Sequence, residues 1–207
     1  MSQSTDPGVP VEGRRTGRPR SAAADRAILA ATRAALVELG WSRLTLGDVA
    51  SRAGVAKTTL YRRWPGKNEL VVDALAELFD GLALPPDGGS LEADIVGVVL
   101  RFAALLERPE VRSALMALIA EGAYDAALRD RIRSAIVNRQ KRLVLEGRAR
   151  AVHRREIPPA PEPGPQADLI FDVIAGTVVH RALVSAEPVD ETWASALAAL
   201  VAAGLRG

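Results

Sequence analysis

The stretch from Gly54 to Lys67 concentrates the side chains of this sequence that are best suited to recognising a polyanion. It reads Gly-Val-Ala-Lys-Thr-Thr-Leu-Tyr-Arg-Arg-Trp-Pro-Gly-Lys. Gly54 predicts a sharp turn, and the short helix after it carries cations and hydroxyls on one face and Leu60 on the other. Lys and Arg on such a helix reach phosphates and base edges in the major groove of DNA. The pattern is typical of the turn and second helix of a helix-turn-helix unit.

The elements that must hold this helix in place come before it in the chain. A first helix is expected to begin near Ser21 or Asp25, both common N-cap types, and to stop at Gly40. The run Thr45-Leu-Gly-Asp48 resembles a capping box and opens a second helix through Ala53. Residues at helical spacing give the unit a small core: Ile28, Thr32, Ala35, Leu36, Leu39, Val49, Ala50, Leu60 and Trp64.

A basic arm precedes this unit. Residues 1–20 are rich in Pro, Gly, Ser and Arg and have almost no large apolar side chain, which predicts disorder. The arm ends in Arg18 and Arg20. The run Gly17-Arg18-Pro19 resembles the core of an AT-hook, which fits an extended strand into an A·T minor groove. A basic tail docked on phosphates is the plainer interpretation, and both indicate nucleic acid as the partner.

Charge is divided unevenly along the chain. Residues 1–67 contain 12 Lys and Arg against 5 Asp and Glu, a net charge of +7, whereas residues 68–207 carry a net charge of −5. This asymmetry favours a polyanion-binding N-terminal part joined to an acidic part with a different partner. Chance clustering on a solvated face is the alternative.

A larger helical body is predicted after the short helix. A helix that begins at Lys67 and ends near Gly81 has an apolar face long enough to join the two parts. Chain breaks are expected at residues 84–89 and in a Pro-rich loop at 157–165. Further helices are expected over residues 90–107, 109–120, 125–155, 168–185 and 190–203. No strand pattern appears, so the predicted fold class is all-α, with a three-helix N-terminal domain joined to a helical body.

The sequence lacks the residues that several classes of function require. The absence of cysteine excludes disulfide scaffolds, thiolate catalysis and cysteine-based zinc sites. His153 and His180 have no His or carboxylate at ligand spacing, so neither a metal, a cofactor nor a catalytic base is expected. No export signal is evident and no apolar run approaches about 18 residues, which makes the cytoplasm the default location.

The run from Thr45 to Lys67, with the helix before it, resembles the DNA-binding head of the tetracycline-repressor (TetR) family of bacterial transcription regulators. The resemblance covers about residues 20–80. It implies that Lys57, Thr58 and Thr59 lie at the N-terminal end of the recognition helix, where side chains reach base edges.

The same resemblance implies contacts with the DNA backbone. Tyr61 and Lys67 occupy positions that contact phosphates in the family, and Thr45 matches a backbone contact at a helix N-terminus. Arg62 is a further candidate for a phosphate or guanine contact. Ala56 departs from the family, which often has a capping Ser there, so one hydroxyl contact is lost.

The last two predicted helices bear on assembly. Apolar residues surround nearly the whole circumference of the helix over 168–185, and such a helix must bury two faces. One face would meet its own domain and the other a second subunit, as in the four-helix dimer interface of the family; a central helix of a monomer is the alternative. The expected interface residues are Phe171, Ile174, Val178, Arg181, Trp193, Leu197 and Leu200.

The acidic body is expected to contain a mostly apolar cavity for a small molecule, between the helix over 67–81 and the helices that follow. The candidate ligand contacts are Phe102, Met116, Tyr124, Phe171 and His180. Ordinary core packing is the plainer interpretation of each of them.

These observations favour a homodimeric DNA-binding regulator without enzymatic activity, most simply a repressor that a small-molecule effector releases from a palindromic operator. The expected parts are a basic arm over 1–20, a helix-turn-helix domain over 21–67 and a ligand-binding and dimerisation domain over 68–207. Two alternatives belong to other classes: an all-α enzyme whose basic head binds an anionic substrate, and an architectural protein that binds every duplex equally.

Overall fold

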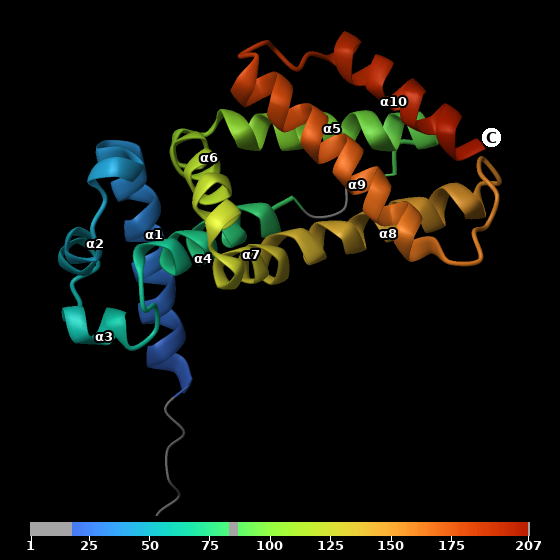
Figure 1. Ribbon diagram of the computed structural model, residues 1–207. Coiled ribbons are helices and arrows are strands. Elements are labelled where there is room, and N and C mark those ends of the chain that lie inside the picture. The colour runs from blue at the N-terminus through green and yellow to red at the C-terminus, as the bar shows by residue number, and fades with distance from the viewer. Residues whose placement is uncertain (1–17, 83–86, 207) are drawn as a thin grey trace, which may run out of the picture.

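The N-terminal head of the molecule consists of three helices, α1 (Arg18–Arg43), α2 (Leu46–Arg52) and α3 (Lys57–Tyr61). The structure is a computed structural model that describes residues 18–82 and 87–206. The head lies at one end, and the C-terminus lies at the far end of an elongated helical body (Figure 1).

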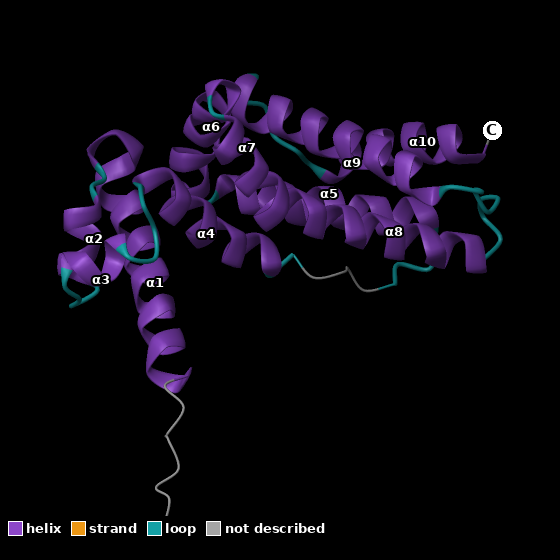
Figure 2. Cartoon of the chain, turned by 60° about the horizontal axis from the view of Figure 1, so that its bottom comes forward, coloured by secondary structure: helices purple, strands orange, loops and turns teal. Residues whose placement is uncertain are grey.

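The body follows the head in the chain and consists of helices joined by loops, without a strand in the described residues (Figure 2). Its elements are α4 (Lys67–Asp80), α5 (Leu91–Glu107), α6 (Pro109–Tyr124), α7 (Ala126–Ile132), η1 (Arg133–Val137), α8 (Asn138–His153), α9 (Pro163–Val179), η2 (His180–Val184) and α10 (Glu191–Arg206). The two η segments are π-helical turns. α5 packs against both α9 and α10, and α8 packs along α9. The predicted all-α class is confirmed.

The first helix begins earlier than predicted. α1 includes Arg18–Arg20, so the expectation of an extended strand is wrong for these residues, whereas Gly17 lies outside the described residues. Proline is tolerated at position 19 because the first helical turn has no acceptor for its missing N–H, and the alanines that follow favour helix. The predicted stop at Gly40 is confirmed by a φ of 70° and a ψ of 173°, outside the helical region.

Three boundaries in the body also differ from the prediction. Gly122 does not interrupt α6; it is buried, and a Cβ there would lie 3.5 Å from Cγ of Arg129 in the next helix. α9 begins inside the predicted Pro-rich loop, at Pro163, because proline fits a first helical turn. The helix expected over 125–155 is divided by η1.

The core of the head is small and comes from all three helices. Ile28 and Leu36 of α1, Val49 of α2 and Leu60 of α3 are fully buried. Trp64, which follows α3, is also buried, as its spacing predicts. α3 has five residues. Since a helix this short is unstable by itself, its orientation depends on the burial of Leu60.

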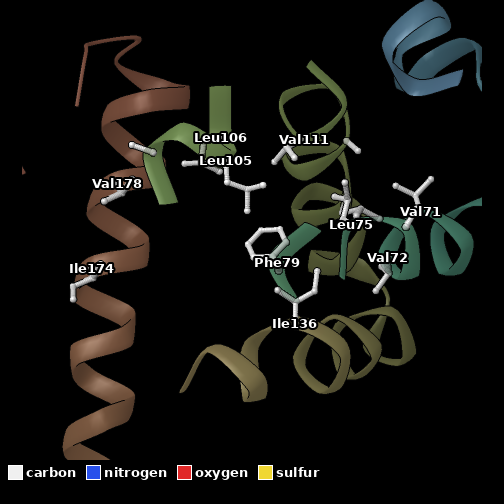
Figure 3. Close-up of a cluster of buried hydrophobic side chains, with 14 of the residues drawn as sticks. Val71, Val72, Leu75, Phe79, Leu105, Leu106, Val111, Ile136, Ile174 and Val178 are labelled. Atoms are coloured by element: carbon white, nitrogen blue, oxygen red, sulfur yellow. The ribbon is translucent and has the colours of Figure 1, made fainter. Parts of the chain in front are cut away.

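α4 is the centre of the body as well as its covalent link to the head. Val71, Val72 and Leu75 of this helix are fully buried. Phe79, near its end, points toward Ile136 of η1 in a cluster that also includes residues of α5, α6 and α9 (Figure 3). The helix that carries the head is therefore itself part of the body core.

Two polar contacts fasten the head to the body beside this link. Nη1 of Arg33 in α1 donates to Oε2 of Glu77 in α4, with a distance of 2.6 Å between the two atoms. The backbone N–H of Trp41 donates to Oγ of Ser113 in α6 at 2.8 Å. Both contacts join the first helix of the head to helices that pack against the body core.

Candidate functional site

One face of α3 points away from the core and presents polar side chains to solvent. Lys57, Thr58, Tyr61 and Arg62 are exposed, and Thr59 is half-buried. The exposed side chains supply two cations, a hydroxyl and a phenol, which are groups that contact phosphates and base edges. The structure therefore brings these predicted DNA-binding residues together on one surface.

The turn before α3 orients this surface. Gly54 has a φ of 65°, in the left-handed region that glycine favours, and so confirms the predicted turn. Ala56 is the N-cap of α3 and makes no side-chain hydrogen bond, as expected for a residue without a hydroxyl. Gly47 of α2 leaves room for Lys57, because a Cβ there would lie 3.3 Å from the Lys57 ammonium nitrogen.

The N-terminus of α2 is closed by the predicted capping box. The backbone N–H of Asp48 donates to Oγ1 of Thr45 at 3.2 Å, and the backbone N–H of Thr45 donates to Oδ2 of Asp48 at 3.1 Å. The Thr45 hydroxyl also donates to the same carboxylate, and this bond lowers the pKa of Asp48. Thr45 is exposed, and its contact with the DNA backbone remains a prediction.

Lys67 differs from the other predicted phosphate contacts because the protein already holds its ammonium group. Nζ of Lys67 donates to the backbone oxygen of Trp41 at 3.2 Å and lies 4.4 Å from the centre of the Trp41 ring. An ammonium group has three N–H donors, so donors remain for a phosphate. Lys67 therefore joins α4 to the end of α1 in addition to its predicted role.

The predicted contacts of the arm lie largely beyond the described structure. Residues 1–17 fall outside the described residues. The backbone of Arg18 and Arg20 belongs to the first turn of α1, but their side chains also fall outside the description. Their DNA contacts remain a prediction.

A set of hydrogen bonds centred on Asp73, called the polar relay below, connects the end of α3 with the body. Oδ2 of Asp73 in α4 accepts from Nε1 of Trp64 at 2.8 Å and from Nη2 of Arg131 in α7 at 2.7 Å. Arg63, beside Trp64, pairs with Asp25 of α1. The spacing in the sequence predicts Trp64 as core but does not indicate Asp73 or Arg131. No local pattern marks them, because they lie 58 residues apart in the chain.

The body contains an apolar cavity of about 140 Å³ between α4, α5, α8 and α9. Of the predicted ligand contacts, Phe102 and Phe171 line it. The remaining wall residues are Phe79, Leu82, Leu91, Asp94, Ile95, Val98, Arg101, Ile136, Gln140, Leu143, Val144, Gly147, Arg148, Arg150, Ile170, Ile174, Ala175 and Leu205. The arginines are not predicted there from the sequence, because the polar side of a helix ordinarily faces solvent.

Three predicted ligand contacts, Met116, Tyr124 and His180, do not line this cavity and are exposed. The buried side of α6 is formed by Val111, Ala114, Leu118 and Gly122. Helical phase therefore turns Met116 toward solvent, and Tyr124, the last residue of the helix, is 95% exposed. His180 begins η2, and its Nδ1 lies 3.4 Å from Oγ of Ser185.

The residues predicted for the dimer interface differ in their exposure in the single chain. Ile174, Val178 and Leu197 are buried within the chain itself. The prediction that they lie in the interface is therefore corrected, and they belong to the core. Leu200 is 74% exposed and remains available to a partner. Phe171 is half-buried in the cavity wall.

Two exposed apolar residues that the prediction left out of its interface lie on α9, namely Leu169 and Val173. Arg181 and Trp193, which the prediction included, contact each other: the Arg181 guanidinium lies 4.9 Å from the centre of the Trp193 ring. Arg181 also pairs with Glu187 at 2.6 Å. The contacts of Arg181 with Trp193 and Glu187 thus hold the connection between η2 and α10 in place.

Neither a metal-binding cluster nor a membrane-spanning helix is found among the described residues. No group of three or more His, Cys, Asp or Glu side chains there is arranged to hold a metal ion. None of the described helices is long and apolar enough to cross a membrane.

Comparison with known proteins assigns both parts of the chain. A family model described as "Bacterial regulatory proteins, tetR family" matches residues 28–74, and one described as "Tetracyclin repressor-like, C-terminal domain" matches residues 85–201. The HTH-type transcriptional regulator Rv1556 of Mycobacterium tuberculosis is 33% identical over 172 residues, which cover 82% of this chain and 81% of the relative.

Two further proteins agree with this assignment. The DNA-binding transcriptional repressor TetR of Mycobacteroides abscessus is 30% identical over 184 residues, which cover 86% of this chain and 88% of the relative. The crystal structure of the TetR family transcription regulator SCO0332 superposes with a TM-score of 0.73 at 30% identity, covering 87% of this chain and 97% of that one. The chain therefore belongs to the TetR family of helix-turn-helix, DNA-binding transcription regulators.

Proposed function

We propose that the protein is a repressor that binds a palindromic operator as a homodimer and is released from it by a small-molecule effector, in the cytoplasm and without a catalytic step. Residues 21–67 bind DNA, and residues 68–207 bind the effector and the second subunit. The observation that carries the proposal is the exposed polar face of α3, joined through α4 to the wall of an apolar cavity.

Base and phosphate contacts are assigned to the exposed face of the head. Lys57, Thr58 and Thr59 enter the major groove at the N-terminal end of α3, with Arg62 and Tyr61 toward its other end. Thr45 and Lys67 contact phosphates on either side. Two copies of α3 about one helical turn of DNA apart would read a palindrome, so operator symmetry follows from the symmetry of the dimer.

An exposed apolar surface on α9 and α10 supports the homodimer. Leu169 and Val173 are four residues apart and therefore share one face of α9, and Gly176 continues that face with open space around it. Leu200 of α10 is exposed as well. Both helices pack on α5. A second subunit would cover these side chains.

The effector acts through α4. Phe79 of this helix is part of the cavity wall, and Lys67 at its other end follows directly on the recognition unit. A ligand that favours a shifted position of α4 changes the distance between the two heads, so they no longer match successive major grooves. The coupling between such sites is typically worth about 1–3 kcal/mol. Repression, rather than activation, is supported by the M. abscessus relative, which is a transcriptional repressor.

Binding to the intergenic DNA beside its own gene tests the proposal. Fluorescence anisotropy on that duplex and on a shuffled duplex of equal length is measured at about 0.15 M salt, where non-specific binding is weak. The intergenic duplex should bind at least about a thousandfold more tightly. Equal affinity for the two duplexes would refute specific operator binding and support the architectural alternative.

A pair of variants assigns the contact to the head. Arg62→Ala removes an exposed cation from the proposed interface, and Arg142→Ala removes an exposed cation from α8 in the body. Only the first should weaken operator binding, by about 1–3 kcal/mol if Arg62 reads a guanine. Similar losses in both variants would mean that the affinity reflects net charge alone.

A further inference from the structure

Arg148 of α8 is a buried cation in the wall of the cavity, and its partners are neutral. Its side chain is 7% exposed. Nε donates to the amide oxygen of Gln166 at 2.7 Å, and Nη2 donates to the backbone oxygen of Pro158 at 3.2 Å. Within the described residues, no carboxylate pairs with this guanidinium. By contrast, Arg154 at the end of the same helix pairs with Asp87, Asp94 and Glu156.

A buried guanidinium without a counter-ion is energetically costly. A buried charge is ordinarily paired, because neutral acceptors compensate only part of the lost hydration. Arg has five N–H donors, and the two hydrogen bonds above use two of them. Unused N–H groups on a side chain that lines a cavity are suited to a planar anion, which accepts two parallel hydrogen bonds.

The one carboxylate among the wall residues does not neutralise Arg148. Oδ1 of Asp94 accepts from the backbone N–H of Gly88 at 2.8 Å, and Oδ2 accepts from Arg154 at 2.9 Å. Oδ2 of Asp94 also lies 3.7 Å from Nη2 of Arg150. Asp94 is therefore engaged by other partners, and Arg148 has no counter-ion among the wall residues.

The remaining wall is apolar and limits the size of the ligand. The rings of Phe79 and Phe102 are 6.1 Å apart at an angle of 53° and form one side. Phe79, Ile136 and Ile174, three wall residues, are labelled in Figure 3. A volume of about 140 Å³ is close to that of an engineered apolar cavity, about 150 Å³, that holds benzene. The cavity thus suits a small ring or a short chain.

We propose that the ligand of this cavity is a small apolar carboxylic acid whose carboxylate pairs with Arg148 while its hydrocarbon part lies among the phenylalanines. This inference rests on the proposed function, because it names the chemical class of the effector. A carboxylate fits better than a phosphate, which is bulkier and, as a dianion, costs more to dehydrate in an apolar site. The neutral partners Gln166 and Pro158 hold the guanidinium in position before the acid binds.

Calorimetric titration of the full chain tests the ligand class. The probes are benzoate, phenylacetate and hexanoate, each compared with its own primary amide, which has a similar shape but no charge. At least one acid should bind about tenfold or more tightly than its amide, since a hydrogen bond to a charged group contributes about 1.5–3 kcal/mol. Acids and amides that bind alike, or amides that bind better, would overturn the proposal without the use of any variant.

Variants then locate the carboxylate. Arg148→Gln should reduce acid binding to the level of the amide, whereas Arg142→Gln removes an exposed cation from the same helix and should leave the preference unchanged. A preference that survives in a folded Arg148→Gln protein would refute the role of Arg148. If Arg148→Gln does not fold, Arg148→Lys keeps the charge but loses the planar fork. It should weaken acid binding more than amide binding, and equal weakening of both would count against the pairing.

The calorimetric assay contains no DNA, so it can refute the ligand class without refuting DNA recognition, and the reverse also holds. An acid that binds in the cavity but leaves the affinity for the operator unchanged would support the ligand class and refute the effector mechanism. Operator binding that no carboxylic acid alters, together with no acid binding, would refute the ligand class and leave DNA recognition intact.

Discussion

The indole N–H of Trp64 donates to the carboxylate of Asp73 at 2.8 Å, and this bond ties the end of the recognition unit to the helix that enters the body. The same carboxylate oxygen accepts from Arg131 of α7 at 2.7 Å. Trp64 is buried, whereas Asp73 and Arg131 are partly exposed. One carboxylate therefore sets the position of α3 relative to α4 and of α4 relative to α7.

Asp73→Ala should destabilise the protein and make the position of the head relative to α4 less well fixed. The substitution leaves the buried Trp64 N–H without an acceptor and Arg131 without its carboxylate, which costs about 1–3 kcal/mol. Urea unfolding measures the loss, and operator titration should show a parallel fall in affinity. Glu121→Ala changes an exposed carboxylate on α6 and is the matched control. An unchanged midpoint in Asp73→Ala would mean that the relay contributes nothing to stability.

The head could be predicted in detail because its signals are local in the sequence. Thr45 and Asp48 are three residues apart and form the expected capping box, and Gly54 has the expected positive φ. Hydrogen bonds of this kind depend on neighbours in the chain, so residue types at fixed spacing are sufficient to identify them.

The cavity and the outer surface of the body could not be predicted in the same way. Arg142 and Arg148 lie on the same helix and look alike in the sequence, yet one is exposed and the other lines the cavity. Val173 and Ile174 are adjacent in a helix that is apolar on nearly all sides, so periodicity does not show which one faces a partner. Tertiary packing decides both cases.

Lys67→Ala should affect both DNA binding and stability, unlike Lys57→Ala. Both variants should flatten the slope of log affinity against log salt by about one unit if each ammonium neutralises one phosphate. Lys67→Ala should also lower the melting temperature, because its ammonium group bonds to the Trp41 carbonyl and lies over the Trp41 ring. A salt slope that is unchanged in Lys67→Ala would show that its role is structural alone.

Leu200→Lys should convert the proposed dimer to a monomer. The side chain is 74% exposed in the single chain, so the substitution does not disturb the core, but a charge inside an interface is unfavourable. Light scattering after size-exclusion chromatography measures the mass, and operator affinity should fall with it. Met116→Lys, on the exposed side of α6, should stay dimeric. A wild-type protein that is monomeric at micromolar concentration would contradict the homodimer itself.

Gly54→Ala should lower the stability of the head through backbone strain alone. A Cβ at this position meets no atom within 4 Å, but φ is 65°, and an L-residue in the left-handed region costs about 1–2 kcal/mol. Gly204→Ala is the control, since this exposed glycine of α10 also has open space around it but no positive φ. It should be stabilising by up to about 1 kcal/mol. Thermal unfolding of both variants checks the opposite signs, and a neutral Gly54→Ala would show that the turn adapts.

The stability of the head should fall in acid because of Asp48. The hydrogen bond from the Thr45 hydroxyl lowers the pKa of Asp48 in the folded state. A depressed pKa contributes stability that is present above the unfolded pKa of about 3.9 and is lost as the pH falls through the lower folded value. Asp48→Asn should therefore be less stable than wild type at pH 7, and the difference should shrink toward about pH 3. Glu121→Gln, which changes an exposed carboxylate of α6, should show no such convergence. A difference between Asp48→Asn and wild type that grows in acid would reverse the sign of this linkage and contradict the capping role of the carboxylate.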